Sequence, residues 1–573
     1  HAPDAGSLKV LVEKVMADLV NPVVGVAASP LIKGMALAES FLAAKFNKPG
    51  YNIVDHYTYV LTGDGCMMEG IEYEAASLAG TLKLGKLIVI YDSNKITIEG
   101  STDIAFTEDV GKRHEAQGWH VVYVENGNDI DAVSKAVDEA KSVADKPSLI
   151  IAKTQIGYGC PKKQGTASAH GEPLGEECIA ETRKNLGYDY EPFEIPSAVK
   201  EHIKAITAQG AQAQKKWEEM LKRYSKEYPE LYNEYVSWHS LVLPDLLNNP
   251  DLWRFEGKMA TRAASGEAIN RLCKLVPNMI GGAADLAPST KTEMKGRGDF
   301  SAANRTGANL RFGIREHAMA AITNGIALHG GLRPYCSTFF VFSDYMKNAM
   351  RMTAIMDLPV IYVLTHDSIG VGEDGPTHEP VEHLAGIRAI PNMTVFRPAD
   401  AKETMAGYVA ALTSKKPFSI ILTRQNLPLY QETDTRAMKG AYILKDAQNP
   451  DIILMASGSE VEFIYKASEE LAQKGIKARV ISFPSWELFE QQSEEYKEAL
   501  LPKSIRARVA VEAGVTQGWH KYVGLDGAVI GIDRFGASAP ANILFREFGF
   551  TVENVVNKAL EVLGKKENAG QLN

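Results

Sequence analysis

Short apolar runs recur along the first part of the chain, and each is separated from the next by a segment with helical spacing. The runs at 57–62, 86–92 and 147–154 are rich in valine, isoleucine, leucine and tyrosine, which is typical of strands. Strands that alternate with helices form parallel sheets, because a parallel connection needs a long crossover. The sequence therefore predicts an α/β fold, with a first domain at residues 1–195.

Two further α/β blocks follow. Residues 196–256 are charged and helical with several prolines, and they predict a connecting arm. The second block is placed at 257–435, and its candidate strands are 358–365, 393–397 and 418–423. The third, at 436–573, opens with a strand, a helix and a strand, which is a compact βαβ unit. We expect three consecutive α/β domains with mainly parallel sheets, the third being smaller, because 573 residues exceed a single core.

The composition excludes several classes of protein. Hydrophobic residues make up 45% of the chain, charged residues 23%, and the net charge is −9 without a long basic block, so a nucleic-acid partner is not expected. No apolar run has the length of about 18 residues that a membrane span needs, and no signal peptide is recognisable. The five cysteines are scattered without a CxxC pair, which suits a reducing compartment and argues against disulfides or structural zinc. We expect a cytoplasmic protein, or a plastid protein whose transit peptide has been removed.

The segment TGDGCMMEG (62–70) places Asp64 between two glycines, where a predicted strand leads into a helix. A helix start attracts anions, and a carboxylate there repels an anion unless a metal ion lies between them. Asn94 lies 30 positions later and follows the strand at 86–92, at the sheet edge where parallel folds bind ligands. The two side chains offer oxygen ligands suited to Mg²⁺ or Ca²⁺. The alternative is two unrelated turn residues, since Asp-Gly and Asn are common in turns.

The spacing between GDG and this asparagine resembles the thiamine diphosphate fingerprint, and the surrounding sequence resembles the transketolase family. The resemblance continues from about residue 34 to the C-terminus, in family order. The segments that carry it include SLAGTLKLGKL (77–87), GGAADLAPS (281–289), RFGIREHAM (311–319), THDSIGVGEDGPTHEPVEHLA (365–385), RPAD (397–400) and RVAVEAG (508–514).

The resemblance implies a thiamine diphosphate-binding fold in which the cofactor diphosphate is held through Mg²⁺, with Ca²⁺ as an alternative ion. The metal ligands would be Asp64, Asn94 and the backbone carbonyl of Ile96. Gly65 and His170 would lie near the diphosphate, and His170 would also reach the substrate and take part in catalysis. An ordinary loop histidine is the alternative at His170.

Glu316, in REH, matches the family's activating glutamate, which hydrogen-bonds the aminopyrimidine ring of the cofactor. Phe339, Phe342 and Tyr345 recur every three residues, which we interpret as one side of a helix. In the family this stripe receives the aminopyrimidine ring, and aromatic stacking suits that role. Without the resemblance, such a stripe is more often part of a hydrophobic core.

The resemblance also implies a substrate site for sugar phosphates. The residues that match a donor-sugar site with proton-transfer groups are His366, Asp374 and His378. Those that match a phosphate clamp are Arg262, Ser289 and Arg424, in which the arginine forks suit a phosphate. Residues 370–375 also read G-x-G-x-x-G, but the acidic residues within it and the prolines after it argue against a dinucleotide site.

The implied activity is that of a transketolase. It would move a two-carbon ketol unit from a ketose phosphate such as xylulose 5-phosphate to an aldose phosphate such as ribose 5-phosphate or erythrose 4-phosphate. The implied assembly is a homodimer with active sites at the interface, where one subunit supplies the diphosphate site and the other supplies the glutamate. No membrane partner is expected.

The N-terminal region departs from the family pattern, which has roughly ninety more residues there. The histidine motifs SGHPG, NGHGS and GHPE are absent, and SPLIKG (29–34) stands where GPLGQG is expected. Lys33 in this segment offers a positive charge that could compensate at the diphosphate. The departure leaves two alternatives open: a dimeric binding or regulatory partner with weak or no catalysis, and a related thiamine diphosphate enzyme with another donor. The phosphate clamp and DGPTHEP argue against a pyruvate-type enzyme.

Overall fold

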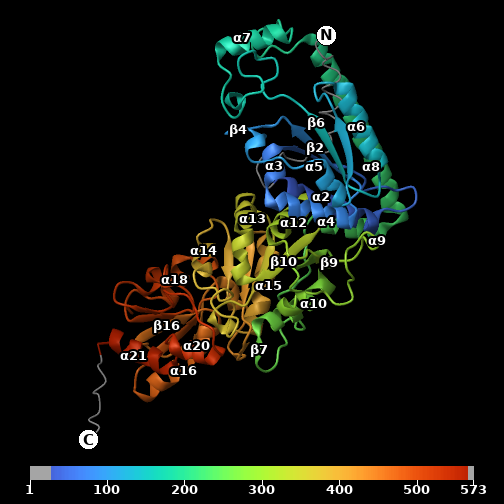
Figure 1. Cartoon of the computed structure of the whole chain (residues 1–573). Helices are drawn as coiled ribbons and strands as arrows, with labels where there is room; N and C mark the ends of the chain where they lie inside the picture. The colour runs from blue at the N-terminus through green and yellow to red at the C-terminus, as the bar shows by residue number, and fades with distance from the viewer. Residues whose placement is uncertain (1–27, 565–573) are drawn as a thin grey trace. The chain divides into compact units, whose positions relative to one another are not determined.

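The computed structural model describes residues 28–564. The described chain forms two compact units. Unit 1 extends to Leu241 and also contains the short segments Phe300–Gly307 and Leu328–Leu332, and unit 2 contains the remaining residues. Figure 1 labels many of the secondary-structure elements of each unit.

Unit 1 is built on a four-stranded parallel sheet in the order β1-β2-β6-β5. The strands are β1 (Thr58–Gly63), β2 (Leu87–Ser93), β5 (His120–Val124) and β6 (Ser148–Lys153). Strand β2 is buried along most of its length, which explains its continuous apolar run, because a central parallel strand is covered on both faces. The first three predicted strands are therefore confirmed as β1, β2 and β6.

Helices precede or connect these strands. They are α2 (Ala28–Phe46), α3 (Asp64–Met68), α4 (Gly70–Leu82), α5 (Val110–Ala116) and α6 (Ile130–Ser142). Helix α6 begins where the Asp129 side chain accepts a hydrogen bond from the backbone N–H of Ala132. Its buried face, from Val133 to Ala140, packs into the same hydrophobic cluster as Ile88 and Ile150 of the sheet.

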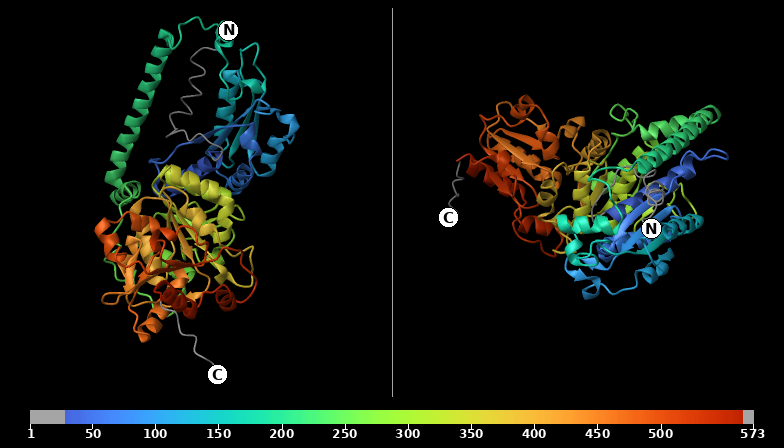
Figure 2. Two further views of the ribbon diagram at one scale, coloured as in Figure 1. Left: turned by 90° about the vertical axis from the view of Figure 1, so that its left-hand side faces the viewer. Right: turned by 90° about the horizontal axis from the view of Figure 1, so that it is seen from above.

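The segment after β6 contains a loop and three helices. The helices are α7 (Glu176–Asn185), α8 (Ser197–Glu227) and α9 (Pro229–His239), and Figure 2 shows α8 as a long green helix. The helical character expected for 196–256 is present in α8 and α9. A disulfide joins Cys160 to Cys178, so the prediction of reduced, unpaired cysteines is wrong for these two. Cys66, Cys273 and Cys336 are free.

Unit 2 begins with a six-stranded parallel sheet in the order β12-β13-β11-β10-β8-β9. Its strands are β8 (Met279–Ala283), β9 (Asn309–Arg311), β10 (Arg333–Phe339), β11 (Ile361–Thr365), β12 (Thr394–Phe396) and β13 (Phe418–Leu422). The helices that precede, connect or follow these strands include α10 (Thr261–Leu275), α12 (Glu316–His329), α13 (Ser343–Ile355), α14 (His383–Arg388) and α15 (Ala401–Ser414). The three strands predicted for this region are confirmed as β11, β12 and β13.

A second, five-stranded sheet of unit 2 has the order β15-β17-β16-β18-β19. Its strands are β15 (Tyr442–Lys445), β16 (Ile452–Ala456), β17 (Ala478–Ser482), β18 (Arg508–Val511) and β19 (Ala528–Ile530), and β15 alone runs antiparallel to its neighbour. Helix α16 (Val461–Gln473) connects β16 to β17 and confirms the predicted βαβ unit. One hydrophobic cluster includes Ile420 of the first sheet and Val480 of the second, so the two sheets share a core.

Candidate active site

The carboxyl ends of β1 and β2 lie side by side in unit 1, because Gly63 pairs with Asp92 in parallel register. Asp64 is the first residue of α3 and is 3% exposed. The Tyr91 hydroxyl donates a hydrogen bond of 2.6 Å to Oδ1 of Asp64, and the backbone N–H of Lys95 donates one of 3.0 Å to Oδ2. Burial and the bond to Asp64 raise the pKa of Tyr91, so its hydroxyl keeps its proton. The loop after β2 is thus folded onto Asp64.

Asn94 belongs to this loop and its side chain is also held in place. Its Oδ1 accepts a hydrogen bond of 3.0 Å from the backbone N–H of Ile96, and its Nδ2 donates to Asp92 at 3.3 Å. Carboxylate, amide and carbonyl oxygens are the ligands that Mg²⁺ prefers, and each accepting oxygen keeps a lone pair. A Cβ atom added at Gly65 would meet nothing within 4 Å, so space is open beside α3. The residues present therefore fit a hard divalent ion with a ligand beside it.

Lys33 does not supply the compensating charge expected for it. Its side chain is 1% exposed and forms an ion pair with Glu72, which lies on α4 and is equally buried. His114 lies on the other side of Glu72, with its Nε2 3.7 Å from Oε1. The positive charge of Lys33 is therefore matched by a carboxylate of α4. Burial lowers the pKa of the ammonium, and Glu72 offsets part of this effect.

His170 lies in the exposed loop between β6 and α7, one residue after a short turn at Ala167–Ala169. Cys160 precedes His170 and Cys178 follows it, so the disulfide between them closes the loop that carries the histidine. The histidine is thus carried by a covalently closed loop with its side chain exposed.

In unit 2, Glu316 is the first residue of α12 and is 8% exposed. The hydroxyl of Thr338, on β10, donates to its Oε1 at 3.4 Å. A carboxylate at a helix N-terminus is favoured by the helix dipole. Glu316 is thus hydrogen-bonded to the strand whose last residue, Phe339, begins the aromatic stripe.

The aromatic stripe does not lie on one side of a single helix, as the sequence analysis expected. Phe339 ends β10, Phe342 lies in a 3₁₀ turn, and Tyr345 lies in the first turn of α13. The three rings are nevertheless adjacent, with centroids 5.8 Å apart for Phe339 and Phe342 and 6.1 Å apart for Phe342 and Tyr345. Phe340 points into the core and is fully buried. Tyr345 is 67% exposed, so this stripe is not a hydrophobic core but one wall of an accessible surface.

His366 follows β11 and packs on this wall, with its ring centroid 3.7 Å from that of Phe339. Arg262 Nη1 lies 3.3 Å from its Nε2, and the Thr365 hydroxyl lies 2.8 Å from its Nδ1. Because a guanidinium only donates, Nε2 accepts and Nδ1 carries the proton. Burial, Arg262 and Arg424 lower the pKa of His366 to about 3, so the imidazole is neutral near pH 7.

Arg262 and Arg424 lie close enough to affect each other: burial and then Arg424 lower the pKa of Arg262. Arg262 also donates 3.0 Å to the backbone carbonyl of Ser289, and Arg424 donates 2.9 Å to that of Val371. Neither arginine forms an ion pair with a carboxylate of the described residues. Two neighbouring guanidinium groups without a carboxylate are an arrangement suited to a doubly charged phosphate.

His378 and Asp374 lie in the loop after β11. The His378 ring packs edge-on against Phe342, with centroids 5.6 Å apart, and its Nδ1 is 3.0 Å from the Thr377 hydroxyl. Asp374 is exposed on the same loop. The structure therefore brings His366 and His378 to the aromatic wall from two positions of one loop.

Several groups that support this site could not be predicted from the sequence. Arg397 is fully buried and donates hydrogen bonds of 2.9 and 2.7 Å to Asp367, the neighbour of His366. It also pairs with Glu460 at the start of the third-domain helix α16. The motif RPAD contained this arginine, but only its burial reveals the role. Thr338 and Tyr91, which hydrogen-bond Glu316 and Asp64, carry no recognisable sequence signal.

Models of three protein domains match the chain. Residues 21–244 match the transketolase thiamine diphosphate-binding domain, residues 257–429 the transketolase pyrimidine-binding domain, and residues 440–551 the transketolase-like C-terminal domain. No helix in the described part of the chain is long and apolar enough to cross a membrane.

Individual relatives agree with the domain models. A probable transketolase of Streptococcus pneumoniae is 53% identical over 532 residues, which cover 91% of this chain and 80% of the relative. The solved transketolase of Leishmania mexicana matches with a TM-score of 0.91 and 43% identity over 94% of this chain and 80% of its own. A Pichia stipitis transketolase mutant in complex with xylulose 5-phosphate matches with a TM-score of 0.91 and 42% identity, over 94% of this chain and 82% of its own.

Proposed function

The chain belongs to the transketolase family of thiamine diphosphate-dependent transferases, and from this we propose how its own residues carry out the reaction. The family moves a two-carbon ketol unit between sugar phosphates. The reading of the chain as a binding or regulatory protein with little catalysis is not favoured by these relationships. We propose xylulose 5-phosphate as donor and ribose 5-phosphate or erythrose 4-phosphate as acceptors.

The observation that carries the proposal is the sequence of groups along one sheet edge of unit 2. A buried glutamate, an aromatic wall, a neutral histidine and two arginines without carboxylate partners follow one another there. The contacts that connect them are Glu316 to Thr338, Phe339 to His366, and His366 to Arg262. A row of groups of this kind offers an aromatic ring a stacking surface at one end and a phosphate two guanidinium groups at the other.

When bound, thiamine diphosphate supplies the carbanion nucleophile that attacks the ketose carbonyl. In our proposal Phe339, Phe342 and Tyr345 bind the pyrimidine ring, and Glu316 holds a proton at the ring nitrogen. Arg262, Ser289 and Arg424 bind the sugar phosphate and so fix the distance of the reacting carbon from the ring.

The two histidines have different tasks in this proposal. His366 donates a hydrogen bond from Nδ1 and accepts one at Nε2, and its lowered pKa keeps it from serving as an acid near pH 7. His378, with Asp374 on the same loop, moves the proton of the sugar hydroxyl. His170 would contact the substrate from its loop.

We propose that Asp64, Asn94 and the carbonyl of Ile96 hold Mg²⁺, with Ca²⁺ as an alternative, against the cofactor diphosphate. The support is the donor set and the hydrogen bonds that fix it. Residues 1–195 would then hold the metal and diphosphate, 196–256 would form the arm, 257–435 would hold the ring and the sugar, and 436–573 would form the C-terminal domain. A homodimer that combines the diphosphate site of one subunit with Glu316 of the other is part of the proposal, and light scattering tests it.

The decisive experiment is the conversion of xylulose 5-phosphate and ribose 5-phosphate by the pure chain with excess thiamine diphosphate and Mg²⁺. Glu316→Gln should lower kcat at least a hundredfold, because the group that holds the ring proton is lost. The control is Glu553→Gln, which changes an acidic residue in the first turn of another helix of unit 2. Equal rates for wild type and Glu316→Gln, with unchanged circular dichroism, would refute the assignment.

Cofactor binding gives a readout that does not depend on turnover. Asp64→Asn should weaken thiamine diphosphate binding at least tenfold in a calorimetric titration with Mg²⁺, because it removes a charged metal ligand. The same titration without Mg²⁺ should show little difference between the two proteins.

A further inference from the structure

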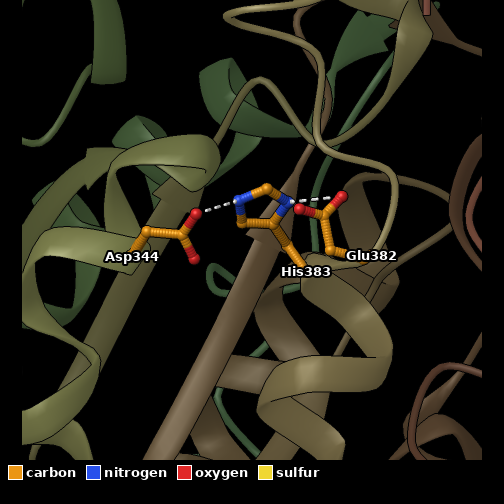
Figure 3. A group of neighbouring side chains, drawn as sticks. All are labelled: Asp344, Glu382 and His383. Carbon is orange, nitrogen blue, oxygen red and sulfur yellow. Dashed lines mark hydrogen bonds and ion pairs between the residues drawn. The ribbon is translucent and has the colours of Figure 1, made fainter. Parts of the chain in front are cut away.

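His383, the first residue of α14, lies between two carboxylates (Figure 3). Its Nε2 is 3.0 Å from Oδ2 of Asp344, which lies in the first turn of α13. Its Nδ1 is 3.8 Å from Oε2 of Glu382, the residue directly before the helix. One ligand atom from each of these three residues lies within 4.8 Å of the other two. The three side chains therefore have the spacing of a metal site, and none of them is among the residues assigned above.

The imidazole of this group is fixed, while the carboxylates face solvent. His383 is 6% exposed and its ring packs against Phe340, with centroids 5.6 Å apart. The Asp344 and Glu382 side chains are 61% and 58% exposed. In the neutral imidazole, the nitrogen that faces a carboxylate at hydrogen-bond distance carries the proton, so Nε2 donates to Asp344. This leaves Nδ1 as a lone pair, and a carboxylate on the opposite nitrogen is the usual support of a metal-binding histidine.

A cation bound at Nδ1 of His383 would give this nitrogen a partner. Among the described residues it has no hydrogen-bond partner, although the histidine is buried. The Glu382 oxygen at 3.8 Å is too distant for a hydrogen bond, and it is electron-rich like the Nδ1 lone pair. Two metal–ligand bonds of about 2.1 Å span up to about 4.2 Å, so one ion can contact both atoms.

We propose that Glu382 and His383 bind Zn²⁺ or a similar first-row divalent cation, with Asp344 as the positioning residue of the imidazole. Imidazole with carboxylate suits Zn²⁺, whereas Mg²⁺ and Ca²⁺ prefer sites made of oxygen alone. Water completes the coordination, because the described chain supplies two direct ligands. The ion would bridge Glu382 and His383 at the start of α14, while the hydrogen bond from His383 to Asp344 connects this site to the start of α13, where Tyr345 of the aromatic wall follows Asp344.

The test is a calorimetric Zn²⁺ titration of the full chain in saturating thiamine diphosphate and Mg²⁺, so that Mg²⁺ fills the site at Asp64. Wild type should bind one more equivalent of Zn²⁺ than His383→Gln, and Glu382→Gln should weaken this site at least tenfold. The matched control is His120→Gln in unit 1. His120 also faces a glutamate, with its Nε2 3.4 Å from Glu139, but its Nδ1 is already 3.2 Å from the Ser148 hydroxyl.

Asp344→Asn separates positioning from ligation. Loss of a carboxylate behind a metal-binding histidine typically weakens the metal about 10- to 100-fold, and we expect this loss with unchanged stoichiometry. The visible absorption of Co²⁺ bound at the same site should shift in Asp344→Asn and disappear in His383→Gln. A variant that only loosens α13 would lower the melting temperature without shifting the Co²⁺ spectrum.

Three results would overturn the proposal. The first is the same zinc stoichiometry in wild type and in a folded His383→Gln variant. The second is an equal loss in His120→Gln, which would mean that zinc is spread over surface histidines. The third is the absence of zinc binding by wild type with a normal circular dichroism spectrum. A Zn²⁺ site that is lost in His383→Gln and retained in His120→Gln supports it whether or not the transferase activity is present.

Discussion

Removing one arginine of the phosphate clamp should selectively lower kcat/KM for phosphorylated substrates. Arg424→Gln removes a guanidinium that is anchored by one hydrogen bond to the backbone carbonyl of Val371. Arg262→Gln removes one that is anchored to Ser289 and also donates to His366. The two variants therefore share the loss of phosphate binding and differ in their effect on the histidine.

The expected loss in kcat/KM follows from the energy of the hydrogen bond that each arginine would donate to the phosphate. A hydrogen bond to a charged group contributes about 1.5–3 kcal/mol, and about 1.4 kcal/mol corresponds to a factor of ten. Arg424→Gln should thus lower kcat/KM for xylulose 5-phosphate about 10- to 100-fold, mainly through KM, because the phosphate is bound equally before and during the reaction. Arg262→Gln should also lower kcat, since Nε2 of His366 loses the donor at 3.3 Å.

The assay compares xylulose 5-phosphate with unphosphorylated xylulose as donor, at fixed acceptor concentration. For Arg424→Gln the loss should appear with the phosphorylated donor and be nearly absent with the free sugar. Arg254→Gln, in which a mostly exposed arginine of the arm is changed, serves as the control. Equal losses with both donors would refute the reasoning, because the arginine would then act on the fold or on the reacting carbon instead of on the phosphate.

Three further predictions concern pH, a buried ion pair and the disulfide. The pKa of His366 is lowered to about 3, so between about pH 6.5 and pH 3 this histidine binds a proton in the unfolded chain but not in the folded chain, and the stability should fall as the pH drops through this range. In the cofactor-free protein, His366→Asn should show a shallower fall of the melting temperature over the same range. Asparagine is chosen because it tolerates the φ of 63° at this position. Lys33→Met should destabilise the protein by about 3–5 kcal/mol in urea titrations, because it removes the lysine that forms an ion pair with the buried carboxylate of Glu72. Adding Glu72→Gln should restore most of the loss, and a double variant no better than the single one would contradict this. Reduction of Cys160–Cys178, or Cys178→Ser, should speed tryptic cleavage of the loop that the disulfide closes, whereas an unchanged cleavage rate would show that the loop is held by other contacts.

The predicted strands emerge correctly where apolar runs are long and buried on both faces, as in β2, β11 and β13. β9 and β19 have only three residues each and were not predicted, because runs of that length carry no reliable period; β12 is equally short but lies inside the longer run 393–397. The aromatic stripe shows a different limit. A spacing of three residues indicated a helix, but a strand end followed by a 3₁₀ turn places the rings on one side equally well.

The residues of the candidate site could be predicted from the sequence, but the ion pairs among the buried charged residues around it could not. Asp64 and Asn94 at neighbouring strand ends follow from strand order alone. The ion pair of Lys33 with Glu72 joins residues 39 positions apart, and nothing local in the sequence indicates it. The same holds for Arg397, which connects Asp367 to Glu460 between two sheets. Long-range pairing of buried charges depends on the packing of helices and strands, which local patterns do not contain.

The state of His366 illustrates how the clamp and the catalytic groups depend on each other. Arg262 and Arg424 both lower its pKa, and a bound phosphate dianion would offset their two positive charges. Substrate binding should therefore move the pKa of His366 upwards. Burial, however, is the larger cause of the shift and is not relieved by the phosphate. His366 thus stays neutral near pH 7 with or without substrate, and the proton transfer that the reaction requires is left to His378, which lies against Phe342 at the rim of the same wall.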